Sequence, residues 1–330
     1  MTLPAVAIAT GDPAGIGPEI SLKAALDPAV RAMCRPLVVG DRGVLQTYAD
    51  LCGISLKDVS ILERTQLKPG ELKIGQMSAA HGLAALDSAR AAIEAALAGK
   101  VSAVVAAPHN ETAIHAAGIE FDGYPSFVAR TTGLPPEDGI LMLCFEHQSR
   151  EVRIAHVTLH LSVAGALRLI TRERVAKTVR AVVAALGKLG VKKPRLAISG
   201  INPHAGENGL FGDEESRIVK PALEDVRREG IEIDDPIGAD ILIQRKGYDA
   251  YIVMLHDQGH VAAKLLAPQR VAGMTIGTPV LFSSVAHGSA MDIAGKNRAD
   301  HRAMVEAIAR VTGNRARPQP VMRAGNAPSA

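Results

Sequence analysis

Aromatic residues are scarce in this chain, which has no tryptophan, four tyrosines and five phenylalanines among its 330 residues. Bases and sugars are usually bound by stacking on flat side chains, so this composition argues against a platform for nucleic acid or carbohydrate. The formal net charge is only +3, which is too small to attract nucleic acid. We therefore expect a small-molecule ligand and no nucleic-acid partner.

Cysteine and long apolar runs are also sparse. Cys34, Cys52 and Cys144 are widely spaced and odd in number, which predicts reduced thiols and no zinc knuckle. No apolar run is long enough to span a bilayer, and the N-terminus lacks the pattern of a signal peptide. These features predict a cytoplasmic protein with no membrane partner.

Short apolar runs alternate with helical patterns along the chain. Strands are expected within 5–10, 36–41, 101–108, 153–160, 195–204 and 249–259, and helices within 79–97, 171–189, 213–229 and 299–311. Strands that alternate with helices predict α/β layers with a largely parallel sheet. Residues 313–330 are rich in Pro, Gly, Arg and Ser, which predicts a flexible tail.

Three of the expected strands run into a segment that carries a histidine. These are His160, His204 in "INPHAGE" and His256 in "LHDQG". Ligands of α/β proteins lie beyond the carboxyl ends of strands, so the three imidazoles predict a divalent-metal site with a position open to substrate. Imidazole favours zinc, cobalt, nickel or iron over magnesium. Each histidine could instead be an ordinary loop residue, and Asp257 could either orient an imidazole or cap a helix.

Two segments are rich in small residues, and the first of them is a candidate for contact with an anionic ligand. "ATGDPAGIGPE" (9–19) is a strand-to-helix turn whose glycines allow close backbone approach. "HGSAMDIAG" (287–295) is a second such loop, and a tight turn before a helix is the alternative interpretation. Neither segment is a G-x-G-x-x-G motif or a P-loop.

"GDPAGIGPE", "NPHAGE", "HDQG" and "HGSAMDIAG" together resemble the 4-hydroxythreonine-4-phosphate dehydrogenase family over about residues 3–312. The resemblance implies two α/β/α domains around a central cleft, as in isocitrate and isopropylmalate dehydrogenases. Residues 1–125 plus 275–312 would form the first domain, and residues 126–274 the second, with the metal site and the dimer interface. The family is homodimeric, with each active site shared between subunits.

The resemblance also implies roles for individual residues. His160, His204 and His256 would be the metal ligands, Lys264 and Asp257 the catalytic residues, and NAD or NADP the cofactor. The cofactor would contact Gly288, Ser289, Asp292 and Gly295. In this chemistry a hydroxyl β to a carboxylate is oxidised, and the resulting keto acid loses CO₂.

The chain departs from the phosphate-using members of the family. Those enzymes carry His-Thr where Tyr124 and Pro125 stand, and Asn and Arg in place of Gly273 and Phe282, whereas Lys264 is kept. A phosphate is best held by several converging donors, so the loss of two of them argues against a phosphorylated substrate.

Several segments, among them "HVTLH" and "SSVAHGSAMDIAG", resemble the terephthalate dihydrodiol dehydrogenase branch. That resemblance implies a small carboxylate substrate, terephthalate 1,2-cis-dihydrodiol, converted to protocatechuate and CO₂. The residues expected to line its pocket are His109, Tyr124, Lys264 and Phe282.

Two other functions remain open at this stage. One is a 4-hydroxythreonine-4-phosphate or related sugar-acid phosphate dehydrogenase of pyridoxal phosphate biosynthesis, with a rebuilt phosphate site. The other is a metal-dependent hydrolase in which the three histidines activate water, although it would leave "HGSAMDIAG" unexplained.

Overall fold

The computed structural model describes residues 3–64, 67–268 and 271–313. Its strands are β1 (Ala5–Ala9), β2 (Arg35–Gly40), β3 (Ile61–Glu63), β4 (Ala103–Ala106), β5 (Ile140–His147), β6 (Arg150–His156), β7 (Arg195–Ile198), β8 (Glu232–Ile233), β9 (Ala250–Val253), β10 (Ala272–Ile276) and β11 (Phe282–Val285).

The α-helices of the described residues are α1 (Gly17–Leu26), α2 (Pro28–Met33), α3 (Arg42–Cys52), α4 (Ala79–Leu97), α5 (Glu111–Ala116), α6 (Tyr124–Thr131), α7 (Val163–Leu169), α8 (Arg172–Lys188), α9 (Lys220–Arg228), α10 (Ala239–Leu242), α11 (His256–Leu266) and α12 (Arg302–Val311). Short 3-10 segments η1 (Leu56–Asp58), η2 (Pro136–Asp138) and η3 (Pro203–Gly209) and the π-helical turn η4 (Glu215–Val219) connect them.

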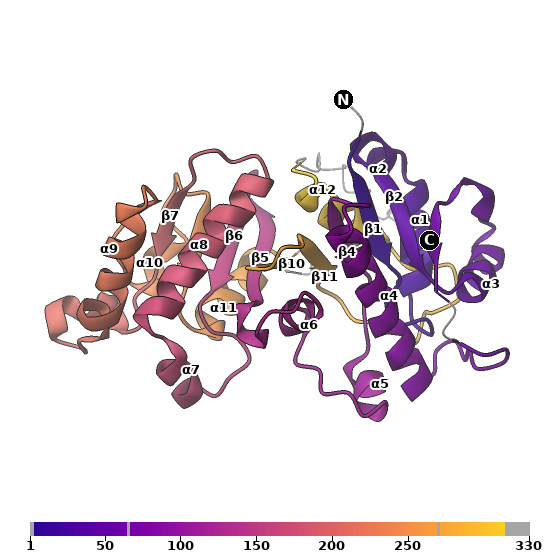
Figure 1. Cartoon of the computed structure of the whole chain (residues 1–330), viewed down its shortest axis with the longest axis horizontal. Coiled ribbons are helices and arrows are strands. Elements are labelled where there is room, and N and C mark those ends of the chain that lie inside the picture. The colour runs from indigo at the N-terminus through magenta and orange to yellow at the C-terminus, as the bar shows by residue number, and fades with distance from the viewer. Residues whose placement is uncertain (1–2, 65–66, 269–270, 314–330) are drawn as a thin grey trace, which may run out of the picture.

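The molecule has two lobes that lie side by side (Figure 1). The lobe drawn in indigo and purple contains β1–β4 with α1–α5, and the other contains β6–β9 with α7–α10. The chain passes from the first lobe to the second near α6 and returns through β10 and β11 to α12. Segments far apart in the sequence therefore meet at the junction between the lobes.

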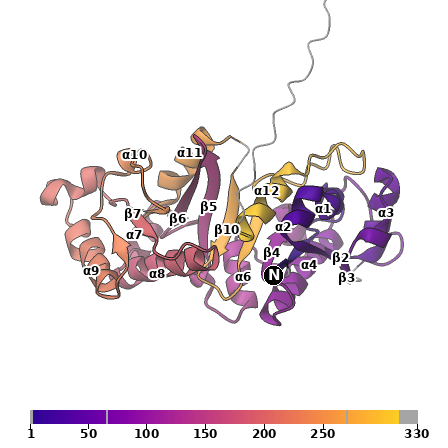
Figure 2. The same cartoon turned by 90° about the horizontal axis from the view of Figure 1, so that it is seen from above.

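A single sheet runs through both lobes in the order β3-β2-β1-β4-β11-β10-β5-β6-β9-β7-β8. Pairing is parallel at both ends of this order and antiparallel at β11-β10, β10-β5 and β5-β6. Helices cover both faces, with α8 and α11 on opposite sides of β5 and β6 (Figure 2). The α/β class with a largely parallel sheet is thus confirmed.

Alternation along the strands divides the core between the two faces. In β1, Val6 and Ile8 pack into the cluster on the side of α1 and α3, whereas Ala7 and Ala9 pack into the cluster beneath α4. Because both faces are covered, β1 is apolar at every position, as in other parallel sheets. Side-chain caps fix several helix starts: the hydroxyl of Ser78 accepts a hydrogen bond from the backbone N–H of His81 at 3.2 Å, at the start of α4.

The elements differ in detail from the sequence predictions. The strands expected to end in histidine are shorter, because β6 ends at His156, β7 at Ile198 and β9 at Val253. The expected helix over 213–229 is divided into η4 and α9. The domain boundaries at 125 and 274 remain predictions, and they fall inside α6 and β10.

Two further predictions concern the C-terminal tail and membrane-spanning segments. The flexible tail predicted over 313–330 lies outside the described residues except for Gly313. Among the helices that the structure describes, none combines the length and the apolar character needed to cross a bilayer.

Candidate functional site

His160 and His256 come together at the junction of the lobes. His160 lies in the loop after β6, and His256 is the first residue of α11, which follows β9. Because β6 and β9 are neighbouring parallel strands, the segments beyond their carboxyl ends meet, and the two ring centroids are 5.6 Å apart. The structure thus brings together two of the three predicted metal ligands.

Each of these imidazoles is oriented through its Nδ1 atom. Nδ1 of His160 lies 3.2 Å from the backbone oxygen of Asp122, and Nδ1 of His256 lies 2.7 Å from Oδ1 of Asp257. Oxygen acceptors at Nδ1 favour the tautomer in which the other ring nitrogen, Nε2, carries the free lone pair. This is the arrangement by which proteins prepare histidine to bind a metal, so the two residues fit a divalent ion of the kind predicted.

Asp257 itself was predicted either to orient an imidazole or to cap a helix. The N-cap of α11 is Leu255, and Asp257 is the second residue of the helix. Its carboxylate contacts the neighbouring His256 at 2.7 Å. In this structure Asp257 therefore orients a ring, and the capping interpretation is wrong.

Sequence analysis missed two further histidines that pack behind this pair. The ring of His260 stacks on that of His256 at 3.7 Å between centroids, and the ring of His156 lies 4.8 Å from that of His260. Burial is the main cause that lowers the pKa of His156 to about 3 and that of His260 to about 4. The spacing of 256, 260 and 264 along one helix face is the sequence signal that could have revealed His260.

His204 lies apart from the other two predicted ligands. Its side chain is 64% exposed, its ring packs edge-on against Phe211 at 5.8 Å, and its Nδ1 is 3.5 Å from Glu207. Among the residues that the structure describes, no three His, Cys, Asp or Glu side chains of one chain are close enough to hold a metal. A three-histidine site therefore cannot be completed within one subunit in this conformation.

The loop that carries His204 has an unusual backbone. His204, Ala205, Glu207 and Asn208 all have positive φ values, between 42° and 56°. Left-handed backbone costs roughly 1–2 kcal/mol for each residue with a side chain, so neighbouring contacts must hold it.

The carboxylate of Glu215 holds this loop at its start. Glu215 is 3% exposed, and its Oε1 accepts hydrogen bonds from the backbone N–H groups of Ile201 at 2.7 Å and Asn202 at 2.8 Å. Its Oε2 accepts another from the side-chain amide of Asn202 at 3.0 Å. Strained backbone that is fixed in this way is typical of functional loops.

An aromatic cluster lies next to His160. The ring of His109 contacts Phe121 at 4.8 Å and Tyr124 at 4.7 Å, and Tyr124 contacts Phe282 at 4.9 Å. The same segment supplies the Asp122 carbonyl that holds His160. Burial lowers the pKa of His109, an effect that Glu111 opposes.

Phe282 and Lys264 are placed differently from each other. Phe282 has no exposed surface and packs against the ring of Tyr124 at 4.9 Å, so it supports that ring from within the core. Lys264 is exposed on α11, two turns beyond His256, and its charge contributes to lowering the pKa of His260. Lys264 therefore lies on the histidine side of the helix.

The predicted cofactor loop is built on the glycine-rich turn that follows β1. The carbonyl of Ser289 accepts a hydrogen bond from the N–H of Ile16 at 2.9 Å, and a Cβ at Gly15 would lie 2.7 Å from Ser289. Buried Glu19 accepts the N–H of Ala299 at 2.8 Å. The protein's own backbone thus packs closely against the glycines of 9–19. The sequence had suggested that these glycines allow the backbone to approach a ligand.

The exposed part of the cofactor loop is the part predicted to bind. Gly288 and Asp292 are exposed, and nothing lies within 4 Å of where a Cβ would stand at Gly288. Ser289 is only 6% exposed, and Gly295 has a φ of 72° that favours glycine. Contact of the cofactor with these four residues remains a prediction.

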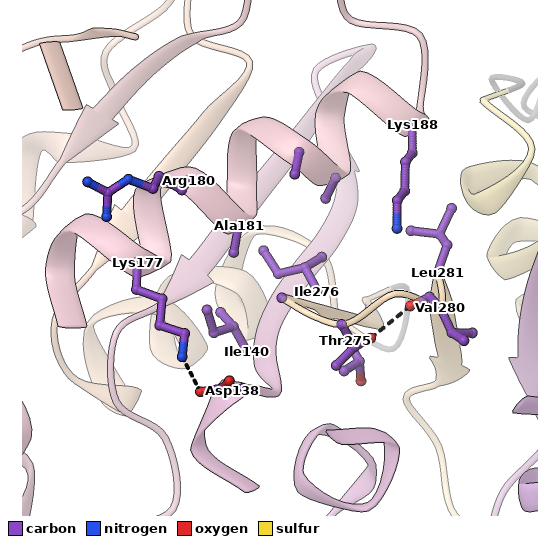
Figure 3. Close-up of a pocket in the computed structure, with 14 residues that line it drawn as sticks. Asp138, Ile140, Lys177, Arg180, Ala181, Lys188, Thr275, Ile276, Val280 and Leu281 are labelled. Carbon is purple, nitrogen blue, oxygen red and sulfur yellow. Dashed lines mark hydrogen bonds and ion pairs between the residues drawn. The ribbon is translucent and has the colours of Figure 1, made fainter. Parts of the chain in front are cut away.

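A cavity of about 310 Å³ lies between α8 and the turn that joins β10 to β11 (Figure 3). Its cations already have partners: Lys177 pairs with Asp138, Arg180 with Glu229 at 2.6 Å, and Lys188 donates to the Pro279 carbonyl at 2.9 Å. None of the predicted site residues lines it. The cavity is therefore separate from the histidine site.

Comparison with known proteins gives consistent matches over almost the whole chain. The family model described as pyridoxal phosphate biosynthetic protein PdxA matches residues 32–311. A 1,2-dihydroxy-3,5-cyclohexadiene-1,4-dicarboxylate dehydrogenase from a Comamonas species is 44% identical over 92% of this chain and 96% of its own length.

Solved structures agree with these matches. A terephthalate 1,2-cis-dihydrodiol dehydrogenase from Burkholderia xenovorans is 40% identical, with a TM-score of 0.75 over 94% of this chain and 98% of that one. A 4-hydroxythreonine-4-phosphate dehydrogenase from Burkholderia phymatum is 34% identical, with a TM-score of 0.81 over 96% and 100%. A β-decarboxylating dehydrogenase from Thermococcus kodakarensis, 20% identical with a TM-score of 0.52 over 95% of this chain and 85% of that one, shares the fold alone.

Proposed function

This chain belongs to the PdxA family and is an oxidoreductase of the dehydrogenase type, and we propose that it oxidises and decarboxylates a cyclic cis-diol carboxylate. The proposed substrate is terephthalate 1,2-cis-dihydrodiol, and the products are protocatechuate, CO₂ and reduced nicotinamide cofactor. The relatives named after dihydrodiol and after hydroxythreonine phosphate both match the chain, so the residues around the substrate must decide between them.

The observation that carries the proposal is the aromatic cluster beside His160. Tyr124 and Phe282 replace polar groups that phosphate-using relatives are expected to have, and they form one apolar wall with Phe121 and Phe127. Burying a dianionic phosphate against such a wall would be costly, because a buried charge needs paired donors. A flat ring carrying carboxylates suits the wall better, with Lys264 as a point charge for one carboxylate.

The histidines would hold a metal at which the substrate binds. His160 and His256 would contribute Nε2 atoms from one subunit, and His204 would come from the partner. When bound, a divalent ion lowers the pKa of the substrate hydroxyl and polarises the new ketone, while the nicotinamide ring accepts the hydride. Asp257 keeps His256 in the metal-binding tautomer.

Lys264 would pair with the substrate carboxylate and would give a proton to the ring oxygen as CO₂ leaves. The proton that the substrate hydroxyl loses on oxidation would restore the one on Lys264, so that no net proton is released. The C–C bond to CO₂ breaks and its electron pair stays in the ring, which becomes aromatic. A bound nicotinamide cofactor would accept the two electrons as hydride, so the reaction would need no other oxidant.

A homodimer completes the proposal. Large apolar side chains are exposed in the segments that carry the three histidines, namely Leu161 (51%) and Val163 (67%), Leu210 (71%) and Phe211 (46%), and Val261 (55%) and Leu265 (76%). Apolar surface of this kind is usually buried in an interface, and a two-fold axis would bring His204 of each subunit toward the other subunit's pair.

The decisive experiment compares two substrates with the metal-loaded protein and either NAD or NADP. We expect turnover of the cis-dihydrodiol with equal amounts of CO₂ and reduced cofactor, and little turnover of 4-phosphohydroxythreonine. Lys264→Met should lower kcat/KM for the dihydrodiol by about 30-fold or more, whereas Lys246→Met, at another exposed lysine, should not. A preference for the phosphate ester would overturn the substrate assignment, and failure to bind any nicotinamide cofactor would favour the hydrolase.

A further inference from the structure

Segment 71–76, between β3 and α4, lies against both loops of the predicted cofactor region. The N–H of Gly75 donates to the carbonyl of Ala14 at 2.8 Å, within the glycine-rich turn. A Cβ at Gly75 would lie 3.1 Å from the carbonyl of Met291, and one at Gly295 would lie 3.0 Å from Cγ2 of Ile74. Segment 71–76 thus touches the 287–295 loop at two points and the 9–19 turn at a third.

His81 fastens this segment to the first turn of α4. The side chain has no exposed surface. Its Nδ1 lies 2.9 Å from the carbonyl oxygen of Gln76, and its Nε2 lies 3.2 Å from that of Glu71. One imidazole ring therefore contacts the backbone at both ends of segment 71–76.

His81 also acts on the glycine-rich turn, through Asp12. Buried Asp12 lies close enough for the charge of His81 to oppose the rise that burial causes in the pKa of the Asp12 carboxyl. Asp12 in turn accepts the N–H of Ala14 at 2.9 Å, and the carbonyl of Ala14 holds Gly75.

We propose that segment 71–76 forms a second wall of the nicotinamide dinucleotide site, next to the 287–295 loop, and that His81 is the positioning residue that holds it. The inference rests on the proposed function, because it takes 287–295 as the cofactor loop. Gly75 and Gln76 are exposed, whereas His81, which holds the segment, is buried. The backbone at Gly75 and Gln76 is therefore held in place and open to solvent beside Met291. Such an edge offers N–H and carbonyl groups to a ligand without an entropic cost on binding.

The test uses two glycines in comparable backbone conformations. Gly75 has a φ of 77° and faces Met291, whereas Gly70 has a φ of 84° and nothing within 4 Å of its absent Cβ. Valine at either position imposes similar backbone strain, but only Gly75→Val places a side chain against the carbonyl of Met291 in the 287–295 loop. Binding of NADH is followed by its fluorescence, which the absence of tryptophan makes easy to read.

We expect Gly75→Val to raise the Kd for NADH by about tenfold or more while metal content and substrate KM change less than about twofold. Gly70→Val should match the wild type. His81→Phe, which keeps the ring volume but removes both hydrogen bonds, should raise the same Kd and speed amide exchange within 71–76.

A Gly288→Val variant separates failure of this inference from failure of the proposed function. If Gly288→Val weakens NADH binding and Gly75→Val and His81→Phe do not, segment 71–76 is not a wall of the site, although the proposed function stands. If the wild type binds no dinucleotide, both are overturned.

Discussion

Helix α11 lies directly on His156 because residue 259 is glycine: a Cβ there would stand 2.3 Å from Nε2 of His156. His156 is 1% exposed and its Nδ1 lies 3.2 Å from the backbone oxygen of Leu141, so the ring cannot move away. The close approach sets the position of the helix that begins with His256. The geometry of the candidate metal site therefore depends on a residue with no side chain.

Gly259→Ala should destabilise the fold and weaken metal binding. We expect a loss of roughly 1–3 kcal/mol in the free energy of unfolding, as for other overpacked cores. Gly187→Ala is the matched control, because Gly187 also lies in a helix but has open space around it, and it should be neutral or stabilising by up to about 1 kcal/mol. Urea denaturation measures both; equal effects of the two changes would contradict the packing argument.

Alanine at His160 or His256 should abolish metal binding and activity while the protein stays folded. Each change removes an imidazole already oriented through Nδ1, so the remaining ligands hold the ion too weakly. Metal content after gel filtration, measured by mass spectrometry, is the readout. His115→Ala, at an exposed position on α5, is the control, and retention of metal by both site variants would refute the assignment.

Two inactive variants should restore activity when their subunits are mixed. In a heterodimer of His256→Ala and His204→Ala subunits, one shared site is damaged twice and the other is intact. Random exchange makes half of the dimers mixed, so about a quarter of wild-type activity should return. No recovery after complete exchange, confirmed with differently tagged subunits, would show that the site is not shared.

Glu215→Gln should lower metal affinity through its effect on the His204 loop. The change replaces one carboxylate oxygen with a donor, which opposes the N–H groups of Ile201 and Asn202. We expect a 10- to 100-fold loss in metal affinity, typical of residues behind a metal ligand. Glu214→Gln, at a neighbour that accepts from the side-chain amide of Asn202 at 2.7 Å and not from its backbone N–H, should cost much less. Competition with a fluorescent chelator measures both constants.

Glu151 should make the stability of the protein fall as pH rises. Burial is the main cause that raises its pKa above 4.5, although Arg310 and Arg153 oppose the rise. The folded state then holds this proton more tightly than the unfolded state, so the contribution to stability is complete below about pH 4 and is lost as pH rises through the folded-state pKa. Glu151→Gln should remove this part of the slope. Denaturation from pH 4 to 7, with exposed Glu120→Gln as control, tests it; parallel slopes for Glu151→Gln and wild type would be evidence against it.

The sequence alone was sufficient for the α/β class and for the family. Short apolar runs such as 5–10 and 101–108 indicate strands that are buried on both faces of the sheet. This signal lies within each run, so it can be read from the sequence. Motifs such as "NPHAGE" and "HDQG" can likewise be recognised in the sequence, because their residues are consecutive in the chain.

Only the tertiary structure decided which of these residues meet. His160 and His256 meet because β6 and β9 are neighbours in the sheet, and strand order is a long-range property that no short segment encodes. His260 and His156 were missed because their contact depends on Gly259 and on the packing of α11. The same holds for His204, which packs against Phe211 and does not join the pair within one chain, and for segment 71–76, whose partners lie far along the sequence. Local patterns reflect the burial of single elements, whereas the site depends on contacts between elements, and those form only when the whole core packs.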